Sequence, residues 1–131
     1  MDIITRLNKI KMLIEEIEIL ENAYKREYDI VTRATQGYKY LTGTGNTTDH
    51  KYDNLAHCAE LLQQKHRELT AEKAEAEKEL QKLNDARYIS ILRLRYLDGL
   101  QWRDIMKITN YSKSGCFRLH NEALNILKST A

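Results

Sequence analysis

The sequence of 131 residues contains no proline and only five glycines. Proline breaks helices and glycine weakens them, so little in this chain would interrupt a helix. The chain also lacks the run of about 18 to 20 uncharged apolar residues that would span a bilayer, and its amphipathic N-terminus is unlike a secretion signal. We therefore expect an all-α, soluble, cytoplasmic protein that does not enter a membrane.

Cysteines and histidines are too few and too scattered for a disulfide framework or a metal site. Cys58 and Cys116 lie far apart in the chain, and the four histidines have none of the spacings that hold zinc. No Ser/His/Asp set or carboxylate pair lies on a scaffold that would support catalysis. The sequence thus predicts reduced thiols, no metal, no cofactor and no enzymatic activity.

Residues 1–83 carry the heptad spacing of two helices that pack along their length. Apolar residues recur every three or four positions from residue 2 to about 34, and leucines recur at multiples of seven from Leu55 to Leu83. A glycine-rich and threonine-rich segment predicts a loop at about 35–48, after which Asp49 would cap the second helix. We expect an antiparallel helical hairpin, packed as a coiled coil.

The apolar stripe on the first helix is wider than a single partner helix would cover, so a homodimer would bury the remainder. The sequence therefore predicts a dimerisation seam. Its residues would be Ile3, Leu7, Ile10, Ile14, Ile17, Leu55, Leu62 and Leu69.

Positive charge gathers in the C-terminal part of the chain. From Asn84 onward there are eight basic and four acidic residues, a formal charge of +4, while the whole chain carries +2 and residues 1–83 therefore carry −2. A basic segment favours binding to a polyanion such as nucleic acid. Residues 84–131 are thus the candidate binding domain.

The sequence of this domain predicts three short helices separated by turns. The first runs from about Asp85 to Leu97 and is broken by Gly99, and the second runs from Gln101 to about Ile108. The third runs from Lys113 to about Lys128. A short helix, a tight turn and a longer helix form a helix-turn-helix.

Turn residues and an apolar stripe support the third helix. Asn110 supplies a turn residue and Ser112 a good N-cap. The residues expected to face inward are Cys116, Leu119, Ala123, Ile126 and Leu127.

The segment ILRLRYLDGLQWRDIMKITNYSKSGCFRLHNEAL resembles the DNA-binding region 4 of sigma-70-type factors in its LRLRY helix, its Gly99 turn and its Trp102, Asp104 and Ile105. It is closer in kind to small phage-encoded regulators of the ArpU and RinA type. In these, a helical extension precedes a sigma-like helix-turn-helix. The resemblance covers residues 86–128 in motifs and the preceding 83 residues only in layout. It implies a regulator that binds specific double-stranded DNA sequences and controls phage late genes in the bacterial host cytoplasm.

The start of the third helix would enter the major groove of DNA. Arg118 is the best candidate for a base edge, because a guanidinium can donate two hydrogen bonds to guanine. The full set expected on the recognition helix is Lys113, Ser114, Gly115, Phe117 and Arg118. The set expected to contact phosphates is Arg103, Lys107 and Ser112.

Other basic and aromatic residues have simpler structural explanations. Arg93 and Arg95 are expected to pair with Asp98 or Asp104 rather than with DNA, and Trp102 to be a core residue. Two alternative functions also stay open. One is a small terminase-like subunit that packages DNA, and the other is a protein-interaction module that binds host RNA polymerase or another host protein.

Overall fold

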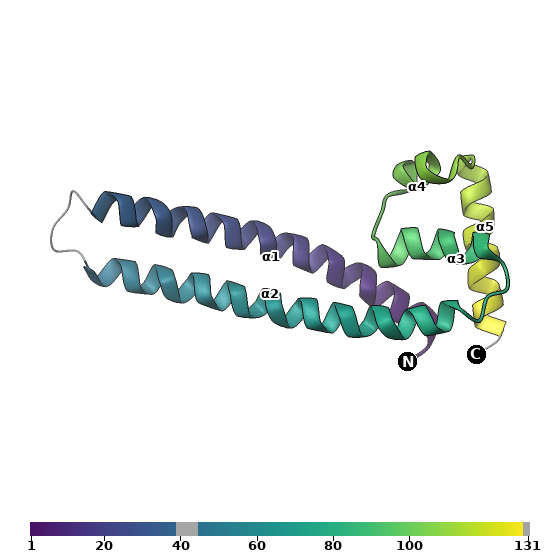
Figure 1. Cartoon of the computed structure of the whole chain (residues 1–131), viewed down its shortest axis with the longest axis horizontal. Helices are drawn as coiled ribbons and strands as arrows, with labels where there is room; N and C mark the ends of the chain where they lie inside the picture. The colour runs from purple at the N-terminus through teal and green to yellow at the C-terminus, as the bar shows by residue number, and fades with distance from the viewer. Residues whose placement is uncertain (39–44, 130–131) are drawn as a thin grey trace. The chain divides into compact units, whose positions relative to one another are not determined.

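The computed structural model describes the backbone of residues 1–38 and 45–129 and the side chains of residues 1–33 and 52–129. All regular structure in these ranges is helical (Figure 1), which confirms the all-α prediction. None of the described helices is long and apolar enough to cross a membrane. The elements are α1 (Ile3–Tyr38), α2 (Gly45–Leu80), α3 (Ala86–Leu92), the π-helical turn η1 (Arg93–Leu97), α4 (Trp102–Thr109) and α5 (Lys113–Ser129).

The two long helices extend past the ends predicted for them. α1 continues to Tyr38 and α2 begins at Gly45, so the predicted loop at 35–48 was too long and Asp49 lies inside α2 rather than at its cap. An established helix gains one hydrogen bond for each residue added, and a glycine costs only about 1 kcal/mol relative to alanine. Gly37 therefore did not stop α1, and Gly45 is the first residue of α2. The middle of the predicted loop, residues 39–44, lies outside the described residues.

The chain forms two compact units. The first, here called the C-terminal unit, combines Met1–Ile14 with Leu69–Ala131, and the second, called the hairpin unit, is Glu15–Glu68. The C-terminal unit is larger than the predicted domain of residues 84–131, because the start of α1 and the end of α2 belong to it. Gly99 shows this directly, since a Cβ at that position would lie 3.1 Å from Cγ2 of Ile14.

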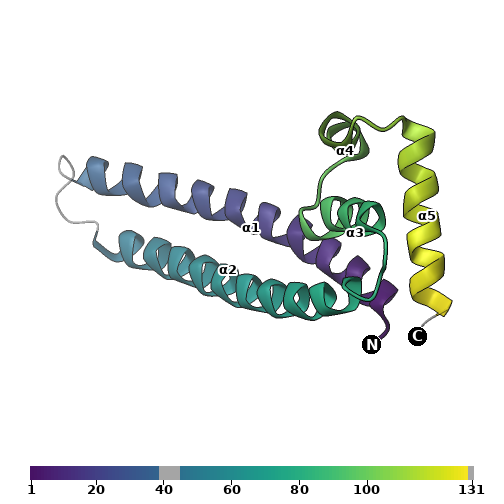
Figure 2. The ribbon, with the colours of Figure 1, turned by 45° about the vertical axis from the view of Figure 1, so that its right-hand side comes forward.

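In the hairpin unit the two helical segments lie side by side and run antiparallel (Figures 1 and 2). Lys65 Nζ lies 3.0 Å from a carboxylate oxygen of Glu16, and His66 lies 3.7 Å from Glu21. Among the described side chains of this unit, only Ile17 and Val31 are buried. Two helices without a further layer bury little more than the line where they touch.

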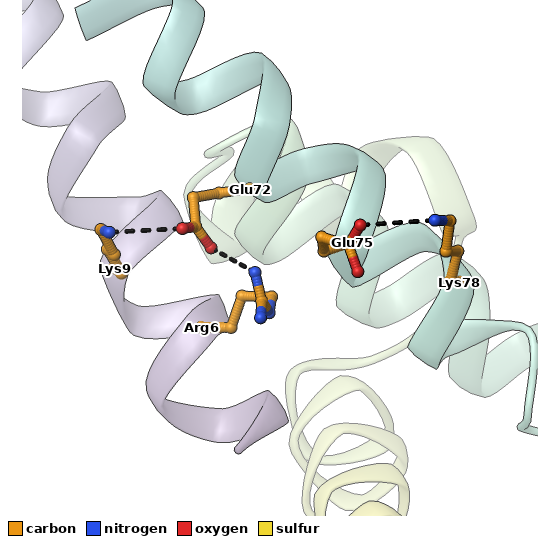
Figure 3. Close-up of polar contacts among 5 residues, drawn as sticks. All are labelled: Arg6, Lys9, Glu72, Glu75 and Lys78. Carbon is orange, nitrogen blue, oxygen red and sulfur yellow. Dashed lines mark hydrogen bonds and ion pairs between the residues drawn. The ribbon is translucent and has the colours of Figure 1, made fainter. Parts of the chain in front are cut away.

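In the C-terminal unit the same helices are held by ion pairs and by a denser apolar layer. Glu72 on α2 lies between two cations of α1, with Arg6 Nη1 at 2.6 Å and Lys9 Nζ at 3.3 Å (Figure 3). Glu75 pairs within α2 with Lys78 at 3.3 Å. The buried apolar residues of α1, of α2 and of the turn just after α2 in this unit are Ile3, Leu7, Ile10, Leu13, Leu69, Ala76, Leu80 and Leu83.

Much of the predicted dimerisation seam is therefore buried inside a single chain. Five of its residues are inaccessible, namely Ile3, Leu7, Ile10, Ile17 and Leu69. The other three, Ile14, Leu55 and Leu62, are half-buried. The heptad spacing correctly marked the packed face, but its buried positions are covered within the single chain.

A second apolar core lies among the three short helices. It consists of Ile91 on α3, Ile105 on α4, and Cys116 and Leu119 on α5. α3 begins at the N-cap Asp85, whose carboxylate accepts the backbone N–H of Arg87 at 2.9 Å. The guanidinium of Arg87 also binds this carboxylate and holds the pKa of Asp85 below its usual value.

The first short helix was expected to be continuous to Leu97, but its last turn is π-helical. The N–H of Asp98 donates to the carbonyl of Arg93, five residues earlier, at 2.9 Å. A π-turn rotates the residues that follow relative to an α-helix. Leu97 is consequently buried together with Ile91 and Leu92, and Leu94 and Tyr96 are half-buried.

Candidate nucleic-acid interface

α4 and α5 form a helix-turn-helix joined by residues 110–112. α4 ends at Asn110, which adopts the left-handed conformation with φ +62° and donates its N–H to Met106 O at 2.9 Å. Asparagine tolerates this conformation better than most residues. α3 and α4 both pack against α5, and α4 crosses near its start (Figures 1 and 2). The predicted positions of both helices and of the turn are confirmed to within one residue.

α5 begins with a hydrogen-bonded cap. Ser112 Oγ accepts the N–H of Gly115 at 3.1 Å, which confirms the predicted N-cap. A Cβ on Gly115 would lie 3.1 Å from this same oxygen, so a larger residue at this position would crowd the cap. The hydroxyl of Ser112 also lies 3.3 Å from that of Ser114. The N-terminal end of α5 therefore presents ordered polar groups at the positive end of the helix dipole.

One face of α5 is buried in the C-terminal unit. Cys116, Leu119, Ala123 and Leu127 are inaccessible, as predicted. Ile126 was also expected to face inward, but it is 38% exposed. At 100° per residue it falls on the edge of this stripe, where a side chain is only partly covered.

The opposite face of α5 is exposed and bears no carboxylate. Ser114, Arg118, Asn121 and Asn125 lie on it at intervals of four, three and four residues. The acidic residue of α5, Glu122, is turned away and accepts the hydroxyl of Tyr88 at 2.7 Å, which raises the pKa of Tyr88. We call these four residues the polar stripe. Serine, arginine and asparagine are side chains that recognise base edges in the major groove.

The sequence analysis predicted Ser114 and Arg118 but missed Asn121 and Asn125. The signal was present, because both asparagines continue the helical spacing of Arg118 on the side opposite the apolar residues. Lys113 lies nearer the boundary of the two faces, with its Nζ 5.8 Å from the ring centre of Phe117. Gly115 is half-buried.

Phe117 was expected to reach DNA, but it belongs to a half-buried aromatic cluster. Its ring meets Trp102 edge to face at 4.9 Å between centres, and Trp102 meets His120 in the same way at 5.2 Å. His120 stacks on Tyr96. Aromatic edge-to-face contacts are attractive, so Phe117 packs α5 against α4. Trp102 is a packing residue, as predicted.

The cations of the C-terminal unit fall into two classes. Arg93 binds Glu77 with two hydrogen bonds of 2.7 and 3.0 Å, and Arg95 lies over the ring of Trp102 at 4.9 Å and donates to Leu100 O. Both arginines are engaged inside the unit as expected, but not with the expected Asp98 or Asp104. Glu77 lies seven residues before the predicted domain of residues 84–131.

The second class has no carboxylate partner. Arg103 and Lys107 lie four residues apart on one face of α4, and Arg118 lies on the polar stripe of α5; all three are exposed. Within residues 1–33 and 52–129, no ion pair is formed by any of them. Their charges are therefore available to an external anion. No cluster of histidine, cysteine or carboxylate side chains in the described part of the chain is suited to hold a metal ion.

A family model described as "Protein of unknown function (DUF1492)" matches residues 30–128. The chain belongs to the DUF1492 family. The match runs from the end of α1 through α2 to nearly the end of α5. The DUF1492 pattern therefore spans a long helix and the helix-turn-helix together. No match was found among curated proteins or among solved structures.

Proposed function

We propose that this member of the DUF1492 family binds double-stranded DNA sequence-specifically and regulates transcription. The observation that carries the proposal is the exposed, carboxylate-free polar stripe of Ser114, Arg118, Asn121 and Asn125 on the second helix of a helix-turn-helix. In this motif the second helix lies in the major groove, with its first residues against the bases.

The unpaired cations of α4 support the same proposal. Arg103 and Lys107 precede the turn, on the helix that crosses the DNA backbone in helix-turn-helix proteins. Contacts from lysine or arginine to phosphates supply affinity that does not depend on sequence and weakens with salt. In this division of labour, α4 fixes the protein on the duplex and α5 reads it.

The regulated genes are proposed from the resemblance to phage regulators of the ArpU and RinA type. That resemblance rests on the LRLRY segment, Trp102 and the YSKSG segment. We infer that the protein acts on phage late promoters in the cytoplasm of a bacterial host. A footprint on such a promoter would support this assignment, and uniform protection of unrelated DNA would contradict it.

Binding of the full-length protein to labelled random duplexes and to phage promoter fragments, at two salt concentrations, tests DNA recognition. We expect tighter binding to the promoter and a loss of affinity as salt rises. Arg118→Ala should lower the preference for the promoter by roughly 1 to 3 kcal/mol. Lys107→Gln should weaken binding to all duplexes and reduce the slope of log K against log salt by about 0.9.

Lys65→Gln is the matched control. Lys65 lies in the hairpin unit, 3.0 Å from Glu16, and its removal should leave both preference and salt slope unchanged. Absence of wild-type binding at low salt would reject the proposal. Retention of a stable complex with host RNA polymerase under those conditions would favour the protein-interaction alternative.

We also infer that two chains associate through the hairpin unit. Ile19 and Ile30 lie 11 residues apart on one face of α1 and are 66% and 41% exposed. Burial of such side chains in a dimer would contribute free energy. Sedimentation should give twice the chain mass of 15.4 kDa, and Ile19→Glu should give a monomer. A ring of many copies would instead support the packaging alternative.

A further inference from the structure

Asn121, at the centre of the polar stripe, is linked to the aromatic cluster by two successive hydrogen bonds. Its Oδ1 lies 3.2 Å from Nδ1 of His120, and Nε2 of the same histidine lies 2.8 Å from the hydroxyl of Tyr96. His120 also stacks on Tyr96 and meets the edge of Trp102. Contacts with Tyr96 and Trp102 therefore hold the imidazole ring in place, and its Nδ1 contacts Asn121.

The direction of these hydrogen bonds follows from protonation. Burial raises the pKa of Tyr96, so its hydroxyl keeps its proton at neutral pH, and burial lowers the pKa of His120, which favours the neutral ring. A neutral imidazole has one N–H. With the amide oxygen of Asn121 facing Nδ1, that nitrogen carries the proton and Nε2 accepts the hydroxyl proton of Tyr96.

In this tautomer of His120, the amide of Asn121 keeps its oxygen toward the imidazole ring. A free asparagine side chain can turn its amide over and exchange donor for acceptor. The N–H of His120 opposes that exchange, because the turned amide would present its NH₂ group to a donor. Asn121 therefore holds a defined order of acceptor and donor, with one lone pair of Oδ1 and both N–H groups of Nδ2 left over.

We propose that Asn121 reads an adenine, with its amide held by His120 in the orientation that this base requires. Adenine offers its N6 amino group as donor and N7 as acceptor in the major groove, which match an amide oxygen and an amide N–H side by side. The assignment rests on the proposed DNA binding. In this proposal Asn121 contacts the base and His120 is a positioning residue.

Arg118 sets the expected place of the adenine in the binding site. Asn121 follows Arg118 by three residues, about 4.5 Å along the helix axis, whereas successive bases on one strand are about 3.4 Å apart. A guanine read by Arg118 and the adenine read by Asn121 are thus expected one or two base steps apart. Asn125 lies four residues beyond Asn121 and thus farther from the start of α5, at a point where a straight helix leaves the groove.

Selection of bound duplexes from a random pool, followed by sequencing, tests the proposal with the full-length protein. The wild type should enrich a guanine and an adenine at the stated separation, and replacing that adenine should weaken its binding about 5- to 150-fold. Asn121→Ala should lose the preference at the adenine position only. Asn54→Ala, at an exposed position of α2 in the hairpin unit, is the matched control and should enrich the wild-type motif.

Two variants examine the role of His120. His120→Phe keeps an aromatic ring in the cluster but removes both nitrogens, and Tyr96→Phe removes only the hydroxyl. Both should weaken the adenine preference while leaving the guanine preference and the affinity for random DNA unchanged. Circular dichroism establishes that each variant is folded.

The outcomes separate this proposal from the proposed function. If the wild type binds no duplex, DNA recognition itself fails. If it binds and enriches a motif, but Asn121→Ala enriches the same motif or loses every position equally, the adenine assignment is overturned. Should Asn121→Ala lose the adenine while both His120→Phe and Tyr96→Phe retain it, the positioning role of His120 is rejected.

Discussion

The hairpin unit and the C-terminal unit differ in both burial and charge. The hairpin unit has seven basic and ten acidic residues, a formal charge of −3, whereas the C-terminal unit has fourteen and nine, a charge of +5. In the described hairpin unit only Ile17 and Val31 are buried, while the C-terminal unit contains a buried layer on α1 and α2 and a second core on α3, α4 and α5.

This difference separates support from binding. Two helices alone can shield one line of contact, so the hairpin unit has little apolar burial with which to hold a precise surface. The three short helices surround their core from several sides and can hold the side chains of α5 in fixed positions. An acidic surface also repels a polyanion and a basic one attracts it. The interface is therefore proposed where rigidity and positive charge coincide.

The largest expected effect comes from removing a core side chain of the C-terminal unit. Ile105 is fully buried, and Ile105→Ala should lower the free energy of unfolding by about 2 to 5 kcal/mol. Gln63→Ala, at an exposed position of the hairpin unit, should change it by less than about 0.5 kcal/mol. Urea unfolding followed by circular dichroism measures both. Equal losses of unfolding free energy would mean that the difference in burial between the two units does not determine stability.

The next effect tests how tightly the C-terminal unit is built around its turn. Gly99 has φ +68°, and a Cβ there would lie 3.1 and 3.2 Å from Cγ2 and Cδ1 of Ile14. Gly99→Ala should therefore cost about 1 to 3 kcal/mol of unfolding free energy. In an Ile14→Ala background the same change should cost less, because the contact is relieved. An unchanged cost in both backgrounds would attribute the whole penalty to the backbone conformation.

A smaller effect distinguishes a paired arginine from an unpaired one. Arg93 binds Glu77, but both side chains are more than a third exposed, so Arg93→Gln should cost no more than about 1 kcal/mol of stability. DNA binding should stay at the wild-type level. Arg118→Gln should leave the free energy of unfolding unchanged and weaken the preference for the specific DNA sequence. Titration of labelled duplex measures DNA binding by each variant, and urea unfolding measures its stability. Weakened DNA binding by Arg93→Gln, or a loss of stability in Arg118→Gln, would contradict this prediction.

The smallest expected effect is a pH dependence centred on His120. Burial lowers its pKa below the ordinary 6.5, so between the folded and unfolded pKa values the unfolded chain binds more protons. Stability should then decrease as pH falls below 6.5 and stop decreasing once the folded-state pKa is passed. Urea unfolding across this range measures the loss. His120→Gln should flatten this part of the profile, and an unaltered profile would assign it to other groups.

Local chemistry allowed the helices and their boundaries in the C-terminal part to be predicted. The turns at Gly99 and Asn110, which have positive φ, and the Ser112 cap of α5 could be predicted because such features depend on neighbours within a few residues. The spacing of Cys116, Leu119, Ala123 and Leu127 likewise marked the buried face of α5. The same spacing, applied to the opposite face, contained Asn121 and Asn125 without showing what they contact.

Tertiary structure decided which partner each side chain meets. Periodicity shows that a residue lies on an apolar face, but several surfaces can cover that face. Ile10 is therefore buried by its own chain rather than by a second copy, and Phe117 packs on Trp102 rather than facing outward. Arg93 finds Glu77, and His120 joins Tyr96 to Asn121, through contacts between helices. The sequence by itself determined the helices and their faces, because these follow from local hydrogen bonding and spacing, whereas pairing depends on how the helices pack.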